Sequence, residues 1–205
     1  MSPPTLWRGA GPLLLASTSP TRRALLEAAG LPVETVAPGI DERALESACA
    51  GLDPRALALR LAEAKAGAVA AAYPDRVVVG ADQVLDLDGE VFHKPTGLDD
   101  ARAQLGRLSG RTHALHAAVA LAQGGRVESF AETARLTLRP LDAGAIAAYV
   151  ALTGTERVRS SVGGYQIEGL GIHLFARVEG DHSTVLGLPL LPLLARLRAG
   201  GWLAF

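Results

Sequence analysis

Apolar and polar residues alternate in blocks over the early part of the chain. Continuous apolar runs of strand length predict strands at Leu13–Ala16 and Val77–Val79. The stretch Val33–Ala37 suggests a third. Ser19-Pro20 and Asp53-Pro54 each set a capping side chain before a proline, which is the pattern of a helix N-terminus. These two patterns predict helices that end near Gly30 and Tyr73. The mixed, polar stretch between 39 and 52 predicts a loop.

Further along the chain the pattern changes to hairpins. Asp88-Gly89 and Gly124-Gly125 are turn pairs between apolar runs, so each predicts an antiparallel pair of strands. Helices are predicted at 97–108, 142–152 and 189–199, and a last strand at 172–178 follows a glycine-rich stretch. Helices interspersed with strands and hairpins predict an α/β fold with a mixed sheet.

Length and composition narrow the class of protein. The chain has 205 residues, 49% of them hydrophobic, and a formal net charge of -1. It is long enough for one domain, 1–205, or one core with two lobes, with residues 1–12 as an irregular extension. The near-neutral charge gives no basic field for a nucleic-acid polymer. The single Cys49 and the absence of a membrane-length apolar run predict a soluble, cytoplasmic protein.

Three segments of the first half carry candidate chemistry. Ser17 and Ser19 lie where a strand meets a helix N-terminus, and Arg22 follows in the first turn; together they suit an anion. The alternative is an ordinary capped helix. Lys65 falls on the helix face of Leu57, Leu61, Ala68 and Val69, so it must snorkel, pair or reach an anion. Asp82 follows the buried run 77–79. Its candidate roles are a general base, a metal ligand and a simple turn residue.

Two loops further along the chain carry weaker candidates. Lys94 precedes a proline in the loop after the first hairpin, where an ammonium suits phosphate. Glu168 lies in the stretch 163–171, whose glycines permit close approach to a ligand. Its carboxylate suits a guanine edge or a metal, and a flexible hinge is the alternative. Lys65 and Lys94 are the two lysines among 20 basic residues.

Taken together, these segments resemble the Maf family of nucleotide pyrophosphatases over residues 13–197. The motifs that carry the resemblance are Leu-Ala-Ser-Thr-Ser-Pro-Thr-Arg-Arg (15–23), Ile-Asp-Glu (40–42), Leu-Ala-Glu-Ala-Lys-Ala (61–66), Gly-Ala-Asp-Gln (80–83), Lys94-Pro95, Leu-Ser-Gly-Arg-Thr-His (108–113), Gly-Tyr-Gln-Ile-Glu-Gly (164–169) and Val-Leu-Gly-Leu-Pro-Leu (185–190). The resemblance implies a two-lobed α/β fold similar to inosine triphosphate pyrophosphatases, with the nucleotide in a cleft between the lobes.

The resemblance also implies roles for individual residues. Phosphate binding falls to Ser17, Ser19, Arg22, Lys65 and Lys94. Asp82 is implied as the catalytic base, and a divalent cation, Mg²⁺ or Mn²⁺, is held through Glu42 and Asp82. The family acts on nucleoside triphosphates in a house-cleaning role and often forms a homodimer.

Two positions bear on the nucleobase. The branch of the family that acts on dTTP and UTP usually has Thr where Gln83 stands and Gln where Glu168 stands. This chain is more similar to the branch that acts on 7-methyl-GTP, so Gln83 and Glu168 are candidate base-recognition residues. The alternatives are a dTTP/UTP-preferring enzyme, a phosphatase that yields orthophosphate, and a nucleotide-binding regulator of cell division that needs no turnover.

Overall fold

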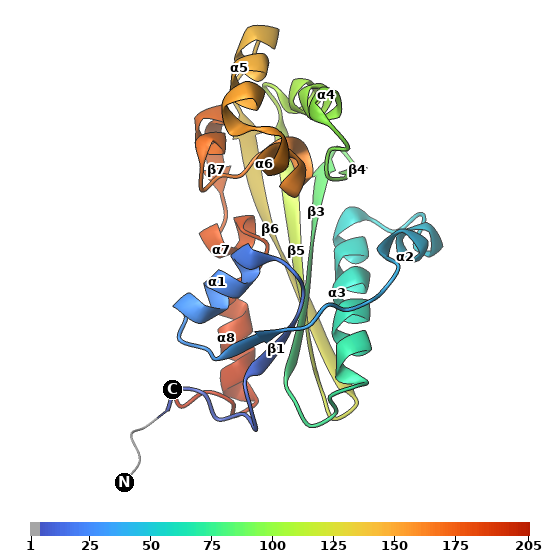
Figure 1. Cartoon of the computed structure of the whole chain (residues 1–205). Helices are drawn as coiled ribbons and strands as arrows, with labels where there is room; N and C mark the ends of the chain where they lie inside the picture. Colours follow the sequence, from blue (N-terminus) through green and yellow to red (C-terminus); the bar gives the residue numbers. More distant parts are fainter. Residues whose placement is uncertain (1–4) are drawn as a thin grey trace. The chain divides into compact units, whose positions relative to one another are not determined.

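A computed structural model describes residues 5–205, so residues 1–4 of the expected extension lie outside the described part. The chain divides into two compact units (Figure 1). Of the described residues, the first unit holds 5–83, 117–132 and 182–205, and the second holds 84–116 and 133–181. This agrees with the two lobes that the family resemblance implies.

The parallel strands of the first unit come from the predicted apolar runs. They are β1 (Leu13–Ala16), β2 (Val33–Thr35) and the start of β3 (Val78–Leu87). Both β2 and β3 pair with β1 in parallel, which gives the order β2-β1-β3. Ala16, the last residue of β1, is level with Gly80, so β3 continues beyond the end of its neighbour.

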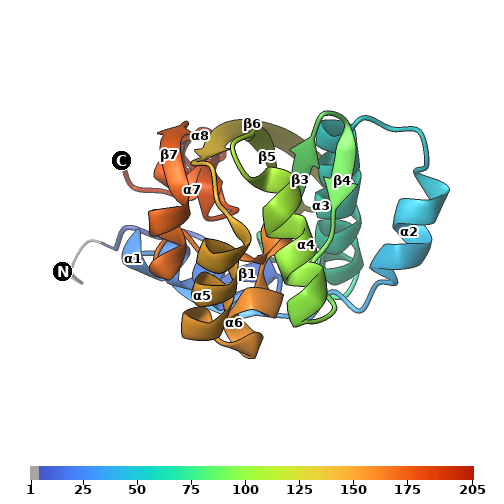
Figure 2. The same ribbon diagram turned by 90° about the horizontal axis from the view of Figure 1, so that it is seen from above.

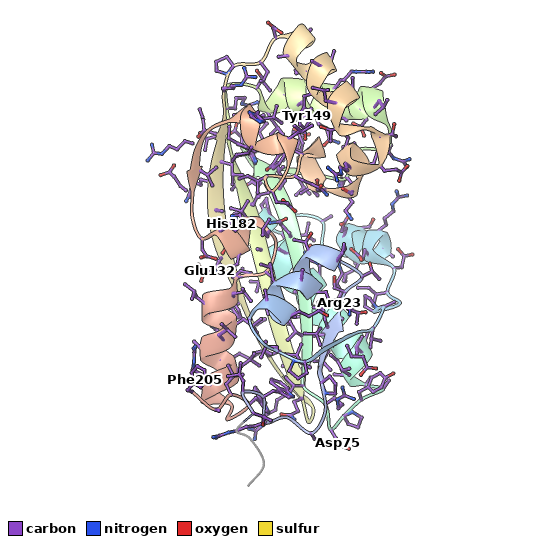
Figure 3. The ribbon with its side chains drawn as sticks, turned by 60° about the vertical axis from the view of Figure 1, so that its left-hand side comes forward. Arg23, Asp75, Glu132, Tyr149, His182 and Phe205 are labelled. Carbon is purple, nitrogen blue, oxygen red and sulfur yellow. The ribbon has the colours of Figure 1, made fainter. Side chains whose placement is uncertain are left out.

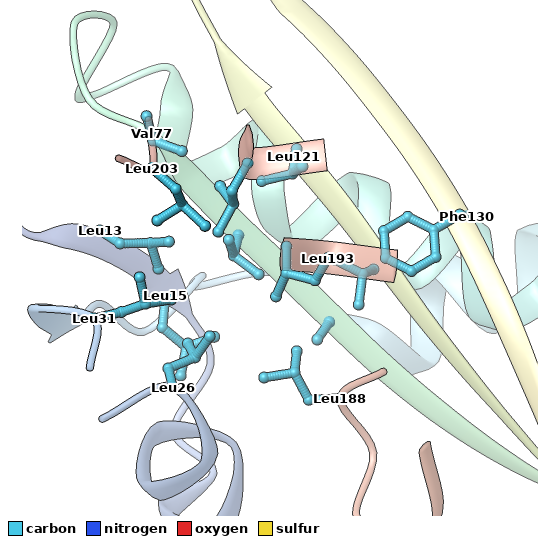
Figure 4. Packing of buried hydrophobic residues seen from close by; sticks show 14 residues of the cluster. Leu13, Leu15, Leu26, Leu31, Val77, Leu121, Phe130, Leu188, Leu193 and Leu203 are labelled. Carbon is cyan, nitrogen blue, oxygen red and sulfur yellow. The ribbon is translucent and has the colours of Figure 1, made fainter. Parts of the chain in front are cut away.

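Helices cover both faces of these strands. Leu13 and Leu15 face a core cluster that includes Leu26 of α1 (Pro20–Ala28) and Leu193 of α8 (Leu190–Ala199) (Figure 4). The opposite face of β3 packs on α3 (Pro54–Ala70). The two are so close at Gly80 that any side chain there would collide with the helix backbone. The first unit is therefore a three-layer arrangement of helix, sheet and helix.

Two sequence predictions in this unit were wrong. The predicted loop 39–52 contains α2 (Glu42–Ala48), which the Asp41 side chain caps by accepting from the Ala44 amide at 3.0 Å. Helix α2 has no buried residue, so it leaves no apolar periodicity in the sequence. Asp82 does not follow a strand but lies within β3, because Gly80 and Ala81 continue the strand instead of ending it.

The chain ends of the first unit meet each other. Trp7 forms an isolated antiparallel bridge with Leu203, and its indole Nε1 donates to the Gly11 carbonyl at 2.6 Å. The described part of the expected extension is thus irregular but packed. A short helix that the sequence did not reveal, α7 (His182–Val185), precedes α8.

The second unit is built on antiparallel strands. Strand β3 turns at Asp88-Gly89 into β4 (Glu90–Phe92), and both turn residues have positive φ, at 56° and 87°. The long strands β5 (Thr112–Gln123) and β6 (Arg126–Leu138) run through both units, and β6 pairs with β7 (Phe175–Glu179). Within the described residues the seven-stranded sheet has the order β2-β1-β3-β5-β6-β7, with β4 on β3.

Helices gather on one another in the second unit. They are α4 (Leu98–Leu108), α5 (Ala143–Thr153) and α6 (Thr155–Ser160) (Figure 2). The sequence missed α6 and extended the last strand too far, since residues 170–174 form a 3-10 turn before β7 begins. No helix in the described part of the chain is both long and apolar enough to cross a membrane.

Candidate active site

The order of the parallel strands marks one place for a ligand. Helix α1 connects β1 to β2 on one face of the sheet, whereas α3 connects β2 to β3 on the other. In doubly wound sheets with this order, ligands bind at the carboxyl ends of the strands where the connections diverge, here between β1 and β3. Ser17 follows β1 at this point, and Asp82 lies just beyond the level at which β1 ends.

The turn after β1 opens helix α1 and is rich in hydroxyl groups. Ser19 is the N-cap, and its Oγ accepts from the Arg22 amide at 3.3 Å. The buried Ser17 Oγ accepts from the Ser19 amide at 3.2 Å. Helix α1 has no acidic residue in its first turn, so its N-terminal dipole is not compensated from within the helix. The segment is suited to an anion.

The guanidinium of Arg22 is fixed by three oxygen atoms. Its Nη1 donates to the Ala81 carbonyl at 2.9 Å and to Ser17 Oγ at 3.3 Å, and its Nε donates to the Gly187 carbonyl at 2.9 Å. The Val77 carbonyl accepts from the Leu14 amide of β1, and the alternation of a strand points the Ala81 carbonyl to the same side. Arg22 therefore bonds a β3 carbonyl that β1 is too short to reach.

The charge on Arg22 is not neutralised by direct pairing. No carboxylate in residues 5–205 forms an ion pair with this guanidinium, and burial lowers its pKa, while the nearby charges of Asp82 and Glu42 raise it. Arg23, by contrast, which Figure 3 labels beside α1, is exposed and pairs with Glu27 at 2.7 Å. Of these two arginines, only Arg22 places its guanidinium beside Ser17 and Ala81 at the end of β1.

Lys65 lies between two carboxylates. Its Nζ is 2.6 Å from Asp82 Oδ1 and 2.9 Å from Glu42 Oε2, and the whole lysine is only 6% exposed. Of the three options that the sequence left open for Lys65, the structure shows pairing. The buried face of α3 includes Ala58, Ala62 and Ala66, and the predicted Ala68 is exposed instead.

A close approach between α3 and β3 sets this arrangement. A Cβ added at Gly80 would lie 2.3 Å from the Ala62 carbonyl oxygen and 2.6 Å from the Ala66 nitrogen. Any side chain at this position would force the helix away from the strand. Lys65 is next to Ala66 and Asp82 shares the face of Gly80, so this contact also sets the distance between the two charged groups.

Gln83 points to the other face of β3. Its amide Nε2 donates to the carbonyls of Thr184 and Val185, at 3.1 and 3.0 Å. Thr184 and Val185 end the short helix α7, and residues 186 and 187 form the turn that follows it. We call this helix end and turn the 184–187 loop; the carbonyl of its last residue, Gly187, accepts from Arg22. This contact could not be predicted from the sequence, because Gln83 and its partners are about 100 residues apart and the partners are backbone atoms.

The remaining candidates belong to the second unit. Lys94 and Glu168 are both exposed there. The loop of Lys94 and the glycine-rich stretch pack on each other, since a Cβ at Gly164 would lie 3.6 Å from Pro95 Cγ. The described residues thus group Ser17, Ser19, Arg22, Glu42, Lys65, Asp82 and Gln83 in one unit and these two in the other.

A buried pair that the sequence did not single out holds the glycine-rich stretch. The hydroxyl of Tyr165 lies 2.5 Å from Nε2 of His113, and the two rings contact Phe175. Burial lowers the pKa of His113 to about 4 and raises that of Tyr165, so both are neutral at physiological pH. Both residues stand in motifs of the family resemblance, which was the available hint.

Comparison with known proteins agrees with these motifs. The model of the family described as Maf-like protein matches residues 12–200. The chain belongs to this family. Among its Maf relatives, the "Nucleoside triphosphate pyrophosphatase" of Nitrobacter hamburgensis is 51% identical over 200 residues, which cover 97% of this chain and 98% of the relative.

A second relative is similar over nearly the whole chain, whereas a solved structure is similar over only part of it. The "7-methyl-GTP pyrophosphatase" of Rhizobium johnstonii is 53% identical over 193 residues, which cover 92% of this Maf chain and 96% of the relative. Among solved structures, the Staphylococcus aureus Ham1 protein is similar with a TM-score of 0.42 and 15% identity, over 62% of this chain and 71% of that one. That likeness is too partial to bear on the site.

Proposed function

We propose that this Maf protein hydrolyses nucleoside triphosphates between the α- and β-phosphates, which yields a nucleoside monophosphate and pyrophosphate. The observation that carries the proposal is the buried Lys65 between Asp82 and Glu42, with Asp82 just beyond the level at which β1 ends. Close relatives with this reaction in their names support it. A house-cleaning role in the cytoplasm fits the single cysteine.

The substrate's phosphates would meet the helix α1 end of the site. The amides of the first turn, the hydroxyls of Ser17 and Ser19 and the fixed charge of Arg22 form one anion-binding corner. An ammonium has three N–H groups, and Lys65 uses two of them on carboxylates. The third is available to a phosphate oxygen. Lys94 is the expected phosphate ligand from the second unit.

The carboxylates fit a divalent cation that arrives with its substrate. Asp82 and Glu42 each bond Lys65 through one oxygen, which leaves the other oxygen of each to coordinate a metal. No group of three or more His, Cys, Asp or Glu in the described residues is arranged to hold a metal. Mg²⁺ typically takes one or two carboxylates and completes its shell with substrate phosphates and water. Such an ion would neutralise phosphate charge.

Asp82 is proposed as the general base. Lys65 donates to its Oδ1. Each carboxylate oxygen has two lone pairs, so Oδ2 has one for a metal ion and one that accepts a hydrogen bond from water. As the water oxygen forms its bond to the α-phosphorus, its proton passes to Asp82 and the bridging oxygen leaves with pyrophosphate. Proton transfer of this kind contributes roughly 10²–10⁴-fold to the rate.

A nucleotide panel tests the proposal. Purified protein with Mg²⁺ or Mn²⁺ is given 7-methyl-GTP, GTP, dTTP and UTP, and the products are separated by ion exchange. We expect stoichiometric monophosphate and pyrophosphate, with the highest kcat/KM for 7-methyl-GTP, as the names of two relatives at 53% and 50% identity suggest. Light scattering on the same sample tests the expected homodimer.

Each alternative has its own outcome in this assay. A phosphatase would release orthophosphate and a diphosphate. A nucleotide-binding regulator would bind the panel and release nothing. Selective hydrolysis of dTTP and UTP would keep the reaction and overturn the preference for 7-methyl-GTP.

A further inference from the structure

The loop of residues 184–187 is tied to the strand that carries Asp82 by two side chains. Gln83 donates to the Thr184 and Val185 carbonyls, and Arg22 donates to the Gly187 carbonyl and to the Ala81 carbonyl. Ala81 and Gln83 are the residues on either side of Asp82. The loop and Arg22 therefore support each other beside the proposed base.

Gly187 is the point at which these contacts converge. Its φ is +86°, a conformation that favours glycine. A Cβ there would lie 3.3 Å from Gln83 Oε1 and 3.4 Å from both Arg22 Nε and Arg22 Nη2. Both side chains pack directly on this residue, so a shift of the loop would move the Gly187 carbonyl that fixes the guanidinium.

The hydrogen bonds of Gln83 bear on its role. A glutamine amide carries two N–H donors, and the contacts at 3.1 and 3.0 Å occupy both. Arg22, in contrast, has five N–H groups and uses its Nε and Nη1 sides. In the described part of the chain its Nη2 group makes no hydrogen bond, so Arg22 has N–H donors left for a ligand.

We propose that Gln83 is a positioning residue for phosphate binding: it holds the 184–187 loop, and the Gly187 carbonyl of that loop holds the guanidinium of Arg22 toward the phosphates. This rests on the proposed function, in which Arg22 binds the substrate's phosphates. Gln83 then acts on the phosphate tail that all nucleotides share and not on the nucleobase.

Inorganic tripolyphosphate separates these two roles, because it has phosphates and no base. In Gln83→Met the length of the side chain is kept and both donors are lost, so Arg22 becomes mobile and must be ordered on binding. We expect the Kd for tripolyphosphate, measured by calorimetry, to rise about tenfold. KM should rise by the same factor for 7-methyl-GTP and for UTP, which leaves the ratio of their kcat/KM values unchanged.

Gly187→Ala disturbs the same guanidinium from the loop side. It should raise the tripolyphosphate Kd by a factor similar to that of Gln83→Met. The Kd of the double variant should be no more than about threefold higher than that of the single variant that binds more weakly. The reason is that the effects of two neighbours acting through one contact are not additive. Gln104→Met in α4 is the matched control, since it removes a glutamine amide from the other unit and should leave the Kd unchanged. Circular dichroism and thermal unfolding confirm that each variant is folded.

The results separate this inference from the function on which it rests. An active wild type whose tripolyphosphate Kd does not change in Gln83→Met, or whose nucleotide selectivity shifts instead, overturns the positioning role alone. Singles that multiply to about a hundredfold loss in the double variant also overturn it. A wild type that hydrolyses no nucleotide and binds no tripolyphosphate overturns the proposed function as well.

Discussion

Each of the two units buries a basic side chain, but the two units treat its charge in opposite ways. In the first unit Lys65, at 6% exposure, stays beside two carboxylates at 2.6 and 2.9 Å. In the second unit His113, at 2% exposure, has only the hydroxyl of Tyr165, and burial lowers its pKa to about 4. The first unit keeps the buried charge of Lys65 in ion pairs, whereas in the second unit the buried His113 is neutral.

This contrast shows where the chain holds a buried charge at a cost to its stability. A buried ion pair rarely stabilises a protein more than apolar side chains of the same volume would. The Lys65 cluster is therefore poorly explained by stability and well explained by a charged ligand. A neutral histidine and tyrosine carry no such cost and suit a purely structural task, here the anchoring of the glycine-rich stretch that includes Gly163 and Gly164.

The largest expected effect tests the charged side of this comparison. Asp82→Asn keeps the shape of the side chain and removes its charge, while Lys65 retains Glu42. We expect kcat for pyrophosphate release to fall roughly 10²–10⁴-fold, because the base is lost. Asp86→Asn, further along the same face of β3, is the control, since Asp86 bonds the Gly89 amide and His116 rather than a lysine. Near-normal turnover in Asp82→Asn would remove Asp82 from the reaction.

The next effect concerns the cost of breaking the buried pair. Lys65→Met leaves the Asp82 carboxylate buried without its ammonium, so the free energy of unfolding should fall by about 3 kcal/mol in urea titrations. Lys65→Met/Asp82→Leu should recover most of this loss and remain inactive. If the single variant is as stable as the wild type, the pair is not desolvated and the contrast with His113 fails.

Much of this fold could be predicted from sequence, because its elements are marked locally. Capping residues before prolines at 19–20 and 53–54 gave α1 and α3, and Asp88-Gly89 gave the first hairpin. Helix α2 buries no residue, so no apolar periodicity marks it in the sequence. The prediction of a loop over residues 39–52 was therefore wrong. Asp82 was predicted to follow a strand because the small residues at 80 and 81 are typical of a strand end. Gly80 is small for another reason, its close approach to α3, which the sequence does not show.

The site divides in the same way. Lys65 stood out because a lysine on an apolar helix face breaks a local rule, and its pairing with Asp82 and Glu42 followed that expectation. The contact of Gln83 with the 184–187 loop had no local mark, since it joins a side chain to backbone atoms far along the chain. Sequence shows which residues are unusual, and only the fold shows which backbone groups they meet.

A smaller effect tests the packing that brings the charged groups together. Gly80→Ala places a Cβ 2.3 Å from the Ala62 carbonyl, so α3 must shift. We expect a loss of about 1–3 kcal/mol in the free energy of unfolding, together with lower kcat, as Lys65 moves from Asp82. Gly67→Ala in the same helix meets nothing within 4 Å and should stabilise by roughly 0.5–1 kcal/mol. Equal behaviour of the two variants would contradict the close approach.

The last effect tests the neutral side of the comparison through pH. The pKa of His113 is about 4 in the folded protein against 6.5 ordinarily, so between these values the unfolded chain binds the extra proton. Stability from the neutral His113 is therefore complete above pH 6.5 and is lost as the pH falls toward 4. From about pH 7.5 to about pH 5, the wild type should lose roughly 2 kcal/mol more free energy of unfolding than His113→Gln, which cannot titrate. Urea unfolding at both pH values measures this difference. Parallel losses in the two proteins would mean that His113 is protonated in the fold, and that the second unit, like the first, keeps its buried charge.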